Sequence, residues 1–209
     1  KIDDSDGNYR KGEGEILAKG PNIMMGYYNK PDKTAEVFKD VNGEQWFMTG
    51  DIGKILKGPG GNEFLKITDR KKELLKTSGG KYVAPAPIEN KFKEDFLIEQ
   101  MMVVGSGEKY AGALIVPNWN SLLRFCKKNG VDVKKTPKVA IAKLPLVEQL
   151  FKEILTKYNQ HFTMTEQVRI YRLLEETWTQ KNGLLTPTFK LKRKAIFEKH
   201  QAIIEEMYA

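Results

Sequence analysis

The division of this 209-residue chain into domains is indicated by one stretch, Asp69-Arg70-Lys71-Lys72-Glu73-Leu74-Leu75-Lys76-Thr77-Ser78-Gly79-Gly80-Lys81. Its charged cluster follows a run of strand-forming residues, and its Ser-Gly-Gly segment favours a turn. The charge balance also changes here. Residues 1–69 carry ten basic and twelve acidic groups, whereas residues 70–209 carry 25 and 15, a net charge of +10. These features predict two domains, 1–69 and 70–209, with a hinge at about residues 69–76.

The patterns on either side of this stretch differ. Upstream, residues 14–55 form short extended runs separated by Gly, Pro and Asn turn signals, which is typical of a β-rich segment. Downstream, three apolar runs predict strands, at residues 98–105, 111–117 and 168–174. The predicted fold class is therefore α+β: a β-rich segment, a hinge, and a small domain in which helices cover a few-stranded sheet.

Four helices are expected in the second domain, the first two at residues 87–95 and 120–128. Apolar residues between Val147 and Tyr158 recur at the i, i+3, i+4 spacing of a helix. A last helix is expected from about Leu191 onward, and its buried side would carry Ile196, Ile203, Ile204 and Met207.

The composition excludes several kinds of structural and functional site. No apolar run reaches the roughly 20 residues that a bilayer span needs. Cys126 is the single cysteine, so an internal disulfide and a thiolate zinc site are excluded, and its apolar helical context predicts a packed residue rather than a nucleophile. His161 and His200 have no evident catalytic partner. We therefore expect no metal ligands in this chain.

Two motifs could bind a ligand. Thr49-Gly50-Asp51 places a carboxylate at a strand end, where it could accept hydrogen bonds from two sugar hydroxyls; alternatively, Asp51 bonds within its own turn. Ser78-Gly79-Gly80 could bring backbone N–H groups close to an anion or a narrow thiol-bearing chain. It lacks the spacing of a nucleotide P-loop, and a solvated basic edge with a glycine turn is the alternative.

A third motif centres on Lys190. A Pro/Thr-containing loop delivers this lysine just before the expected last helix, which suits an ammonium held at a reacting centre. The alternative is an ordinary basic helix start, which the helix dipole disfavours.

Taken in order, these motifs resemble those of the adenylate-forming superfamily, which includes acyl-CoA synthetases, firefly luciferase and peptide-synthetase adenylation domains. The resemblance is strongest to long-chain acyl-CoA synthetases. It covers residues 14–28, then Thr49-Gly50-Asp51, then Asp69 to Pro85, then Phe189-Lys190-Leu191-Lys192-Arg193. Phe189 stands where many relatives have glycine.

The resemblance implies a role for each candidate residue. Thr49, Asp51 and Arg70 would contact the ribose and phosphates of ATP, and Lys72 would be the hinge. Lys190 would contact the carboxylate and the α-phosphate during adenylation. The channel for the pantetheine arm of CoA would be lined by Gly79, Gly80 and Lys81.

The resemblance also implies that the chain is the C-terminal portion of a long-chain fatty acid–CoA ligase. Residues 1–69 would be the tail of the large adenylation domain, and residues 70–209 the small C-terminal lid domain. The N-terminal part of the large domain, with its phosphate loop, acyl tunnel and Mg²⁺ site, would be a partner that this chain lacks. The chain alone is expected to be inactive. ATP, CoA and a fatty acid are the expected ligands, and the expected location is cytoplasmic, with peripheral contact at the inner membrane face and homodimer formation left open.

Two alternatives stay open at this point. A carrier-protein phosphopantetheine could replace CoA as the acyl acceptor. In a different class, the basic segment and aromatics such as Tyr82, Tyr110 and Tyr171 could form a non-catalytic nucleic-acid-binding module. We expect no nucleic-acid partner, because the basic residues are spread among ordinary amphipathic helices and no nucleic-acid motif is present.

Overall fold

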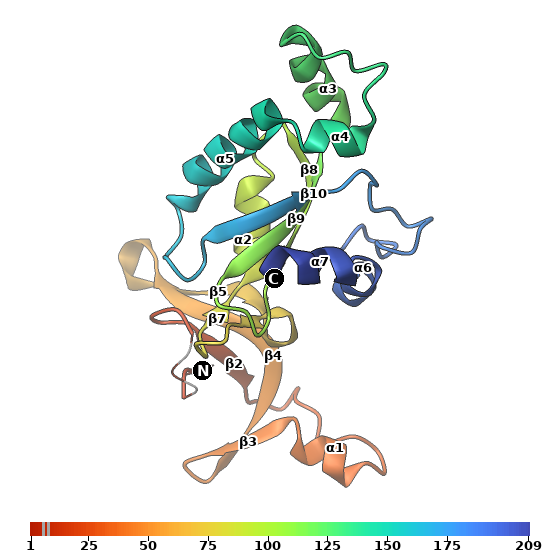
Figure 1. Ribbon diagram of the computed structural model, residues 1–209. Coiled ribbons are helices and arrows are strands. Elements are labelled where there is room, and N and C mark those ends of the chain that lie inside the picture. The colour runs from red at the N-terminus through yellow and green to blue at the C-terminus, as the bar shows by residue number, and fades with distance from the viewer. Residues whose placement is uncertain (6, 8) are drawn as a thin grey trace. The chain divides into compact units, whose positions relative to one another are not determined.

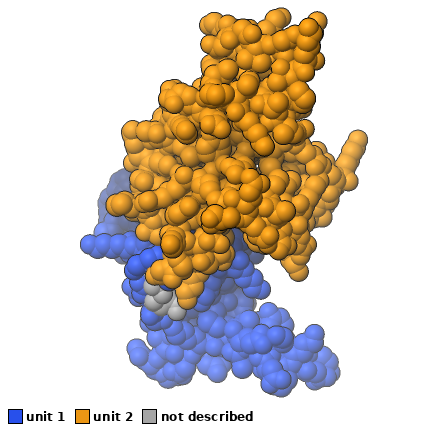
Figure 2. Space-filling view, viewed as in Figure 1, with its two compact units in different colours: residues 1–74, 80–84 blue, residues 75–79, 85–209 orange. Residues whose placement is uncertain are grey.

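A computed structural model describes residues 1–5, 7 and 9–209 of the chain. The chain divides into two compact units (Figure 2). Unit 1 comprises residues 1–74 and 80–84, and unit 2 comprises residues 75–79 and 85–209.

Unit 1 is an antiparallel sheet in which the long strand β4 is central (Figure 1). The strand order is β1-β2-β4-β3, and β5 also pairs with β4. The turn between β4 and β5 contains Gly60 and Gly61, whose φ angles of 75° and 82° favour glycine. The elements are β1 (Ile2–Asp3), β2 (Gly14–Ala18), α1 (Pro31–Ala35), β3 (Phe38–Val41), β4 (Glu44–Lys57), η1 (Pro59–Gly61), β5 (Glu63–Arg70), η2 (Lys71–Glu73) and β7 (Tyr82–Val83).

Unit 2 is built on a three-stranded sheet of order β10-β9-β8. Strands β8 and β9 are antiparallel, whereas β9 and β10 are parallel and are joined through helices α3 to α5. The elements are β6 (Leu75–Lys76), α2 (Pro85–Phe92), β8 (Ile98–Val104), β9 (Ala111–Pro117), α3 (Trp119–Lys128), α4 (Lys138–Ala142), α5 (Pro145–Asn159), β10 (Val168–Leu173), α6 (Arg193–Lys199) and α7 (Gln201–Tyr208).

Helices cover both faces of the unit 2 sheet. In Figure 1, α2 and α5 lie on one side of the sheet, and α6 and α7 lie on the other. Phe92 of α2 contacts Tyr158 of α5, with ring centroids 5.4 Å apart. On the opposite face, side chains from β8 and β9 pack with α6, α7 and the segment before α6; this cluster contains Met102, Val104, Leu114, Val116, Leu174, Trp178, Leu184, Leu185, Ile196, Ile204 and Met207.

These observations confirm the predicted α+β fold class, including the strands near residues 98, 111 and 168. The expected last helix is instead two helices, α6 and α7, which meet at His200. His200 has φ −110° and ψ 17°, outside the α-helical region, and Ile196 and Ile204 on either side of it both belong to the buried cluster. Ile203 is only partly buried there.

Within the described residues, no helix has both the length and the apolar character needed to cross a bilayer. No group of three or more His, Cys, Asp or Glu residues in the described part of the chain could hold a metal ion.

The buried imidazole of His200 makes the stability of the protein depend on pH. The Nε1–H group of Trp178 donates to Nε2 of His200 at 3.5 Å, which requires a neutral ring. Burial lowers the pKa of His200, the nearby Lys199 lowers it further, and Glu176 opposes both effects. A proton therefore binds the unfolded chain more tightly than the folded one.

We predict that the free energy of unfolding falls as the pH drops below the ordinary histidine pKa of about 6.5, and that the fall ends below the folded-state pKa. Urea unfolding at a series of pH values measures this. The matched control is His200→Gln, whose amide oxygen accepts the Trp178 bond at every pH, so its stability should vary less over this range. The same slope in both proteins would contradict the prediction.

Candidate functional site

A bulge in β4 displays the Thr49-Gly50-Asp51 motif. In the pairing of β2 with β4, Glu15 faces Ile52 and Leu17 faces Met48, so three residues of β4 lie opposite one residue of β2. Gly50 has φ 74°, a left-handed value that glycine adopts without strain. Such a bulge changes the direction in which neighbouring side chains point.

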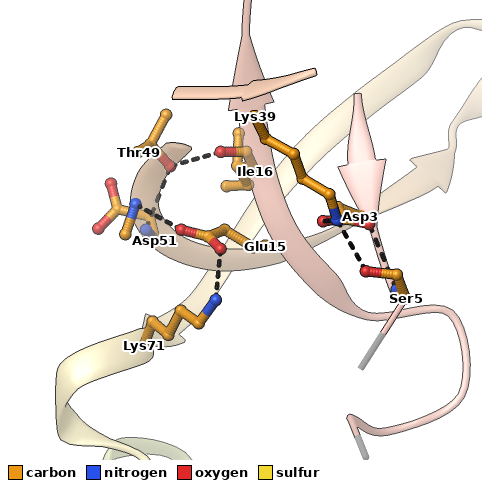
Figure 3. Close-up of polar contacts among 9 residues, drawn as sticks. Asp3, Ser5, Glu15, Ile16, Lys39, Thr49, Asp51 and Lys71 are labelled. Carbon is orange, nitrogen blue, oxygen red and sulfur yellow. Dashed lines mark hydrogen bonds and ion pairs between the residues drawn. The ribbon is translucent and has the colours of Figure 1, made fainter. Parts of the chain in front are cut away.

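Hydrogen bonds hold this bulge in place (Figure 3). The Thr49 hydroxyl donates to the Ile16 carbonyl at 2.8 Å and accepts from the Asp51 amide at 3.1 Å. The Gly50 amide donates to Oε1 of Glu15 at 3.2 Å, and the Lys71 ammonium donates to Oε2 of the same carboxylate at 2.7 Å. Because Glu15 is buried, this ion pair supports the bulge from within unit 1.

The Asp51 carboxylate points away from Glu15 in Figure 3 and pairs with Arg70. The two residues face each other across β4 and β5, and Nε of Arg70 lies 3.0 Å from Oδ1 of Asp51. The Asp51 side chain is 24% exposed and the Arg70 side chain 71% exposed. A carboxylate offers about four acceptor sites and a guanidinium five donors, so both groups keep capacity for a ligand. The structure therefore brings Thr49, Asp51 and Arg70 together.

The glycine segment leaves open space beside the backbone. A Cβ added at Gly80, whose φ is 78°, would meet no atom within 4 Å, and one at Gly79 would meet only the Thr77 hydroxyl, at 4.0 Å. In unit 2 the Ser78 amide donates to the Glu108 carbonyl at 2.9 Å. Lys81 is exposed. A narrow chain could therefore approach this backbone closely. The assignment of Gly79, Gly80 and Lys81 to a CoA channel stays a prediction.

Lys72 lies in the short 3₁₀ helix η2, directly after β5, and it is exposed. Strand β5 extends through Arg70, so the polar stretch begins inside a strand and not in a loop. The role of Lys72 as a hinge and the predicted boundary between residues 69 and 70 stay predictions.

Lys190 lies near the tip of a hydrogen-bonded loop that we call the lysine loop, residues 178–192. Leu185 and Leu191 form an isolated antiparallel bridge at its stem. At its tip the Thr186 amide donates to the Lys190 carbonyl at 2.8 Å, and the Lys190 amide donates to the Thr186 hydroxyl at 3.1 Å. Both backbone polar groups of Lys190 are therefore bonded to a single residue.

The side chain of Lys190 is exposed. Within residues 1–5, 7 and 9–209 its ammonium has no ion-pair partner. The preceding residue, Phe189, has φ 60° and is 74% exposed. A cation on a fixed backbone can meet an incoming anion with little reorganisation, which is the arrangement that stabilises developing negative charge.

Sequence reasoning missed two buried carboxylates that support these sites. Glu15 supports the bulge, and Glu89 of α2 binds Arg193 next to the lysine loop. A signal for Glu89 exists in the sequence, because it adjoins Ile88 on a short, partly apolar helix where a charge needs a partner. Cys126 is buried in α3 as expected, and burial raises the pKa of its thiol.

The left-handed backbone conformation of Phe189 is expected to lower the stability of the protein. A left-handed conformation costs a residue with a side chain about 1–2 kcal/mol, whereas glycine adopts it freely. Because Phe189 buries little surface, we predict that Phe189→Gly raises the free energy of unfolding by up to about 1 kcal/mol. The control Phe189→Val places a β-branched residue there and should lower it by about 1 kcal/mol. Denaturant unfolding of the three proteins measures this, and a loss of stability in the glycine variant would contradict it.

Comparison with known proteins places these features in a family. The sequence profile described as the AMP-binding enzyme C-terminal domain matches residues 72–209. A long-chain-fatty-acid–CoA ligase of Mycobacterium tuberculosis is 35% identical over 199 residues, which cover 94% of this chain and 31% of that protein. Human long-chain-fatty-acid–CoA ligase 1 is 35% identical over 213 residues, covering 100% of this chain and 29% of that protein. The chain thus spans about a third of the length of these relatives.

Solved structures show the same fold. The adenylation domain of a carboxylate reductase from Mycobacterium chelonae superposes with a TM-score of 0.71 at 27% identity, over 100% of this chain and 30% of that one. An adenylation and carrier didomain of carboxylic acid reductase from Segniliparus rugosus, solved in complex with AMP, gives 0.70 at 26% identity, over 100% and 27%. The resemblance to adenylate-forming enzymes is confirmed, and the chain belongs to the family of AMP-binding enzyme C-terminal domains.

Proposed function

We propose that this chain forms the C-terminal part of an ATP-dependent, AMP-forming fatty acid–CoA ligase. The observation that carries the proposal is Lys190, whose backbone is held by two hydrogen bonds to Thr186 at the tip of a loop, while its exposed ammonium has no ion-pair partner among the described residues. The identity to long-chain-fatty-acid–CoA ligases over nearly the whole chain supports this substrate class.

In the proposed first step, a carboxylate oxygen of the fatty acid attacks the α-phosphorus of ATP, and pyrophosphate leaves. Lys190 would contact both the carboxylate and the α-phosphate, where negative charge accumulates. In unit 1, the Asp51 carboxylate would accept hydrogen bonds from the ribose hydroxyls, and the exposed Arg70 guanidinium would face the ribose or phosphate. Thr49 would hold this part of β4 in position.

In the proposed second step, the thiol of CoA attacks the acyl carbon, AMP leaves, and the thiol proton passes to the surroundings. Unit 2 would rotate about Lys72 between the two steps, removing Lys190 and bringing in Gly79, Gly80 and Lys81. The open space beside the two glycines supports this use of the backbone.

The proposal assigns the phosphate loop, the acyl pocket and the Mg²⁺ site to the N-terminal part of the ligase. The 209-residue chain by itself is proposed to be inactive in both steps.

Substitution of Lys190 tests the proposal in the full-length ligase. We predict that Lys190→Ala lowers the rate of acyl-AMP formation by roughly 10²–10³, the scale of losing one preorganised charge. Thioester formation from supplied acyl-AMP should change much less. The matched control is Lys194→Ala, because Lys194 is 91% exposed and its ion pair with Glu198 is an i,i+4 contact at 3.8 Å on the helix surface. Equal losses in both half-reactions, or equal effects of the two substitutions, would refute the role of Lys190.

The hinge is tested separately. Proline fixes φ near −65°, so we predict that Lys72→Pro slows CoA-dependent thioester formation more than acyl-AMP formation. Lys72→Ala removes the same charge without restricting φ and should retain most of the activity. Rapid-quench measurement of the two half-reactions compares them. Normal thioester formation in the proline variant would exclude Lys72 as the pivot.

The acyl acceptor is tested with purified ligase and acyl-AMP. We expect CoA to release AMP faster than a phosphopantetheinylated carrier protein does. The similarity to a didomain that contains a carrier protein favours the second acceptor as the alternative. If AMP is released faster with the carrier protein, the carrier protein and not CoA is the acyl acceptor.

A further inference from the structure

A partly buried ion pair lies next to the lysine loop. Arg193 donates two parallel hydrogen bonds to the Glu89 carboxylate, from Nη1 to Oε1 at 2.7 Å and from Nη2 to Oε2 at 2.8 Å. The Glu89 side chain is 6% exposed and that of Arg193 22% exposed. Two-point pairing of a guanidinium with a carboxylate fixes the direction of both groups as well as their separation.

Glu89 also closes the edge of the unit 2 sheet. Strand β8 is at the end of the order β10-β9-β8, so among the described residues one side of it has no neighbouring strand. The Val103 amide of β8 donates to Oε1 of Glu89 at 2.8 Å. A buried backbone N–H without a partner is costly, so this bond ties α2 to a fixed point on the sheet.

The ion pair joins two layers of unit 2. Glu89 belongs to α2, which lies on one side of the sheet, and Arg193 is the first residue of α6, which lies on the other (Figure 1). The pair therefore reaches around the edge of β8. Arg193 follows Lys190 by three residues, so the position of its guanidinium constrains where the lysine loop ends.

The beginning of the lysine loop is fixed to the same strand. The side-chain amide of Gln100, in β8, donates to the Trp178 carbonyl at 2.9 Å, and its carbonyl accepts from the Trp178 amide at 2.7 Å. The Lys192 amide donates to the Leu184 carbonyl at 2.9 Å, which closes the stem. The loop is thus held at both ends by groups along one sheet edge.

We propose that the Glu89–Arg193 pair is a positioning device for Lys190 that sets the place of its ammonium during acyl-AMP formation. The inference rests on the proposed function of Lys190. Neither Glu89 nor Arg193 contacts the reacting atoms in this account; they act through the backbone of the lysine loop. A lysine at position 193 would keep the charge but not the two-point bond, so Arg193→Lys separates geometry from charge.

Hydrogen exchange tests whether the pair holds the loop. We expect Arg193→Lys in the full-length ligase to speed exchange of the Thr186, Lys190 and Lys192 amides by about tenfold, the scale of one lost hydrogen bond to a charged group. Glu89→Gln is a second variant, since its amide can still accept from Val103 but opposes the guanidinium with its own donor. The matched control is Arg172→Lys, which changes an exposed pair with Glu206. Unchanged exchange in both Glu89 and Arg193 variants would overturn the proposal.

A double-mutant cycle tests whether the pair acts through Lys190. We expect Arg193→Lys to lower the maximal rate of acyl-AMP formation by roughly 10- to 100-fold, the scale of a small misplacement of a catalytic group. Thioester formation from supplied acyl-AMP should stay nearly unchanged. In a Lys190→Ala background, the same substitution should change acyl-AMP formation by less than about twofold.

The outcomes separate this proposal from the proposed function. If Arg193→Lys lowers the rate equally in both backgrounds, the pair is only a general support of unit 2, and the positioning role is overturned while that of Lys190 stands. If Lys190→Ala itself leaves acyl-AMP formation unchanged, the proposed function fails. The positioning role then fails with it, even where exchange shows that the pair holds the loop.

Discussion

The structure of unit 2 depends on a small sheet that is buried on both faces. Successive residues of β8 and β9 are almost all inaccessible to solvent, from Met101 to Val104 and from Ala111 to Val116. Because adjacent side chains of a strand point to opposite faces, such strands need a helical layer on each side. In a three-stranded sheet two strands are edge strands. The backbone N–H and C=O groups on the outer side of β8 therefore need hydrogen-bond partners other than a strand.

That constraint explains why charged groups lie among apolar ones. Glu89 satisfies a backbone amide of β8, and once buried it needs a cation, which Arg193 provides. The segment before Arg193 is thereby fixed at its C-terminal end, and Gln100 fixes its beginning. A polar network that completes the sheet edge consequently also holds the backbone that carries Lys190.

In unit 1, too, a buried carboxylate bonds a backbone amide that strand pairing leaves without a partner, here in a bulge of β4. Its sheet has few buried apolar side chains, among them Ile16, Leu17 and Ile52. In the bulge, three residues of β4 lie opposite one residue of β2, and the buried Glu15 carboxylate accepts a hydrogen bond from the displaced Gly50 amide. The result is a carboxylate, Asp51, that is held by the sheet and still accessible to a ligand.

Much of the fold follows from local pattern. The apolar runs of β8, β9 and β10 and the helical spacing of α5 were predictable because their periods differ and their ends carry turn signals. The break at His200 was not predictable, since the apolar spacing that indicates a single helix continues through it. The motifs around Asp51 and Lys190 were predictable by resemblance, although their supporting carboxylates were not.

The sequence by itself determined the fold class, the family and the candidate site residues, because these depend on residue type and order. The tertiary structure alone decided which distant groups support them. Glu15 meets Lys71, and Glu89 meets Arg193, across 56 and 104 residues of chain. No local pattern specifies such pairs, since burial creates the need for a partner and only the folded backbone determines which one lies within reach.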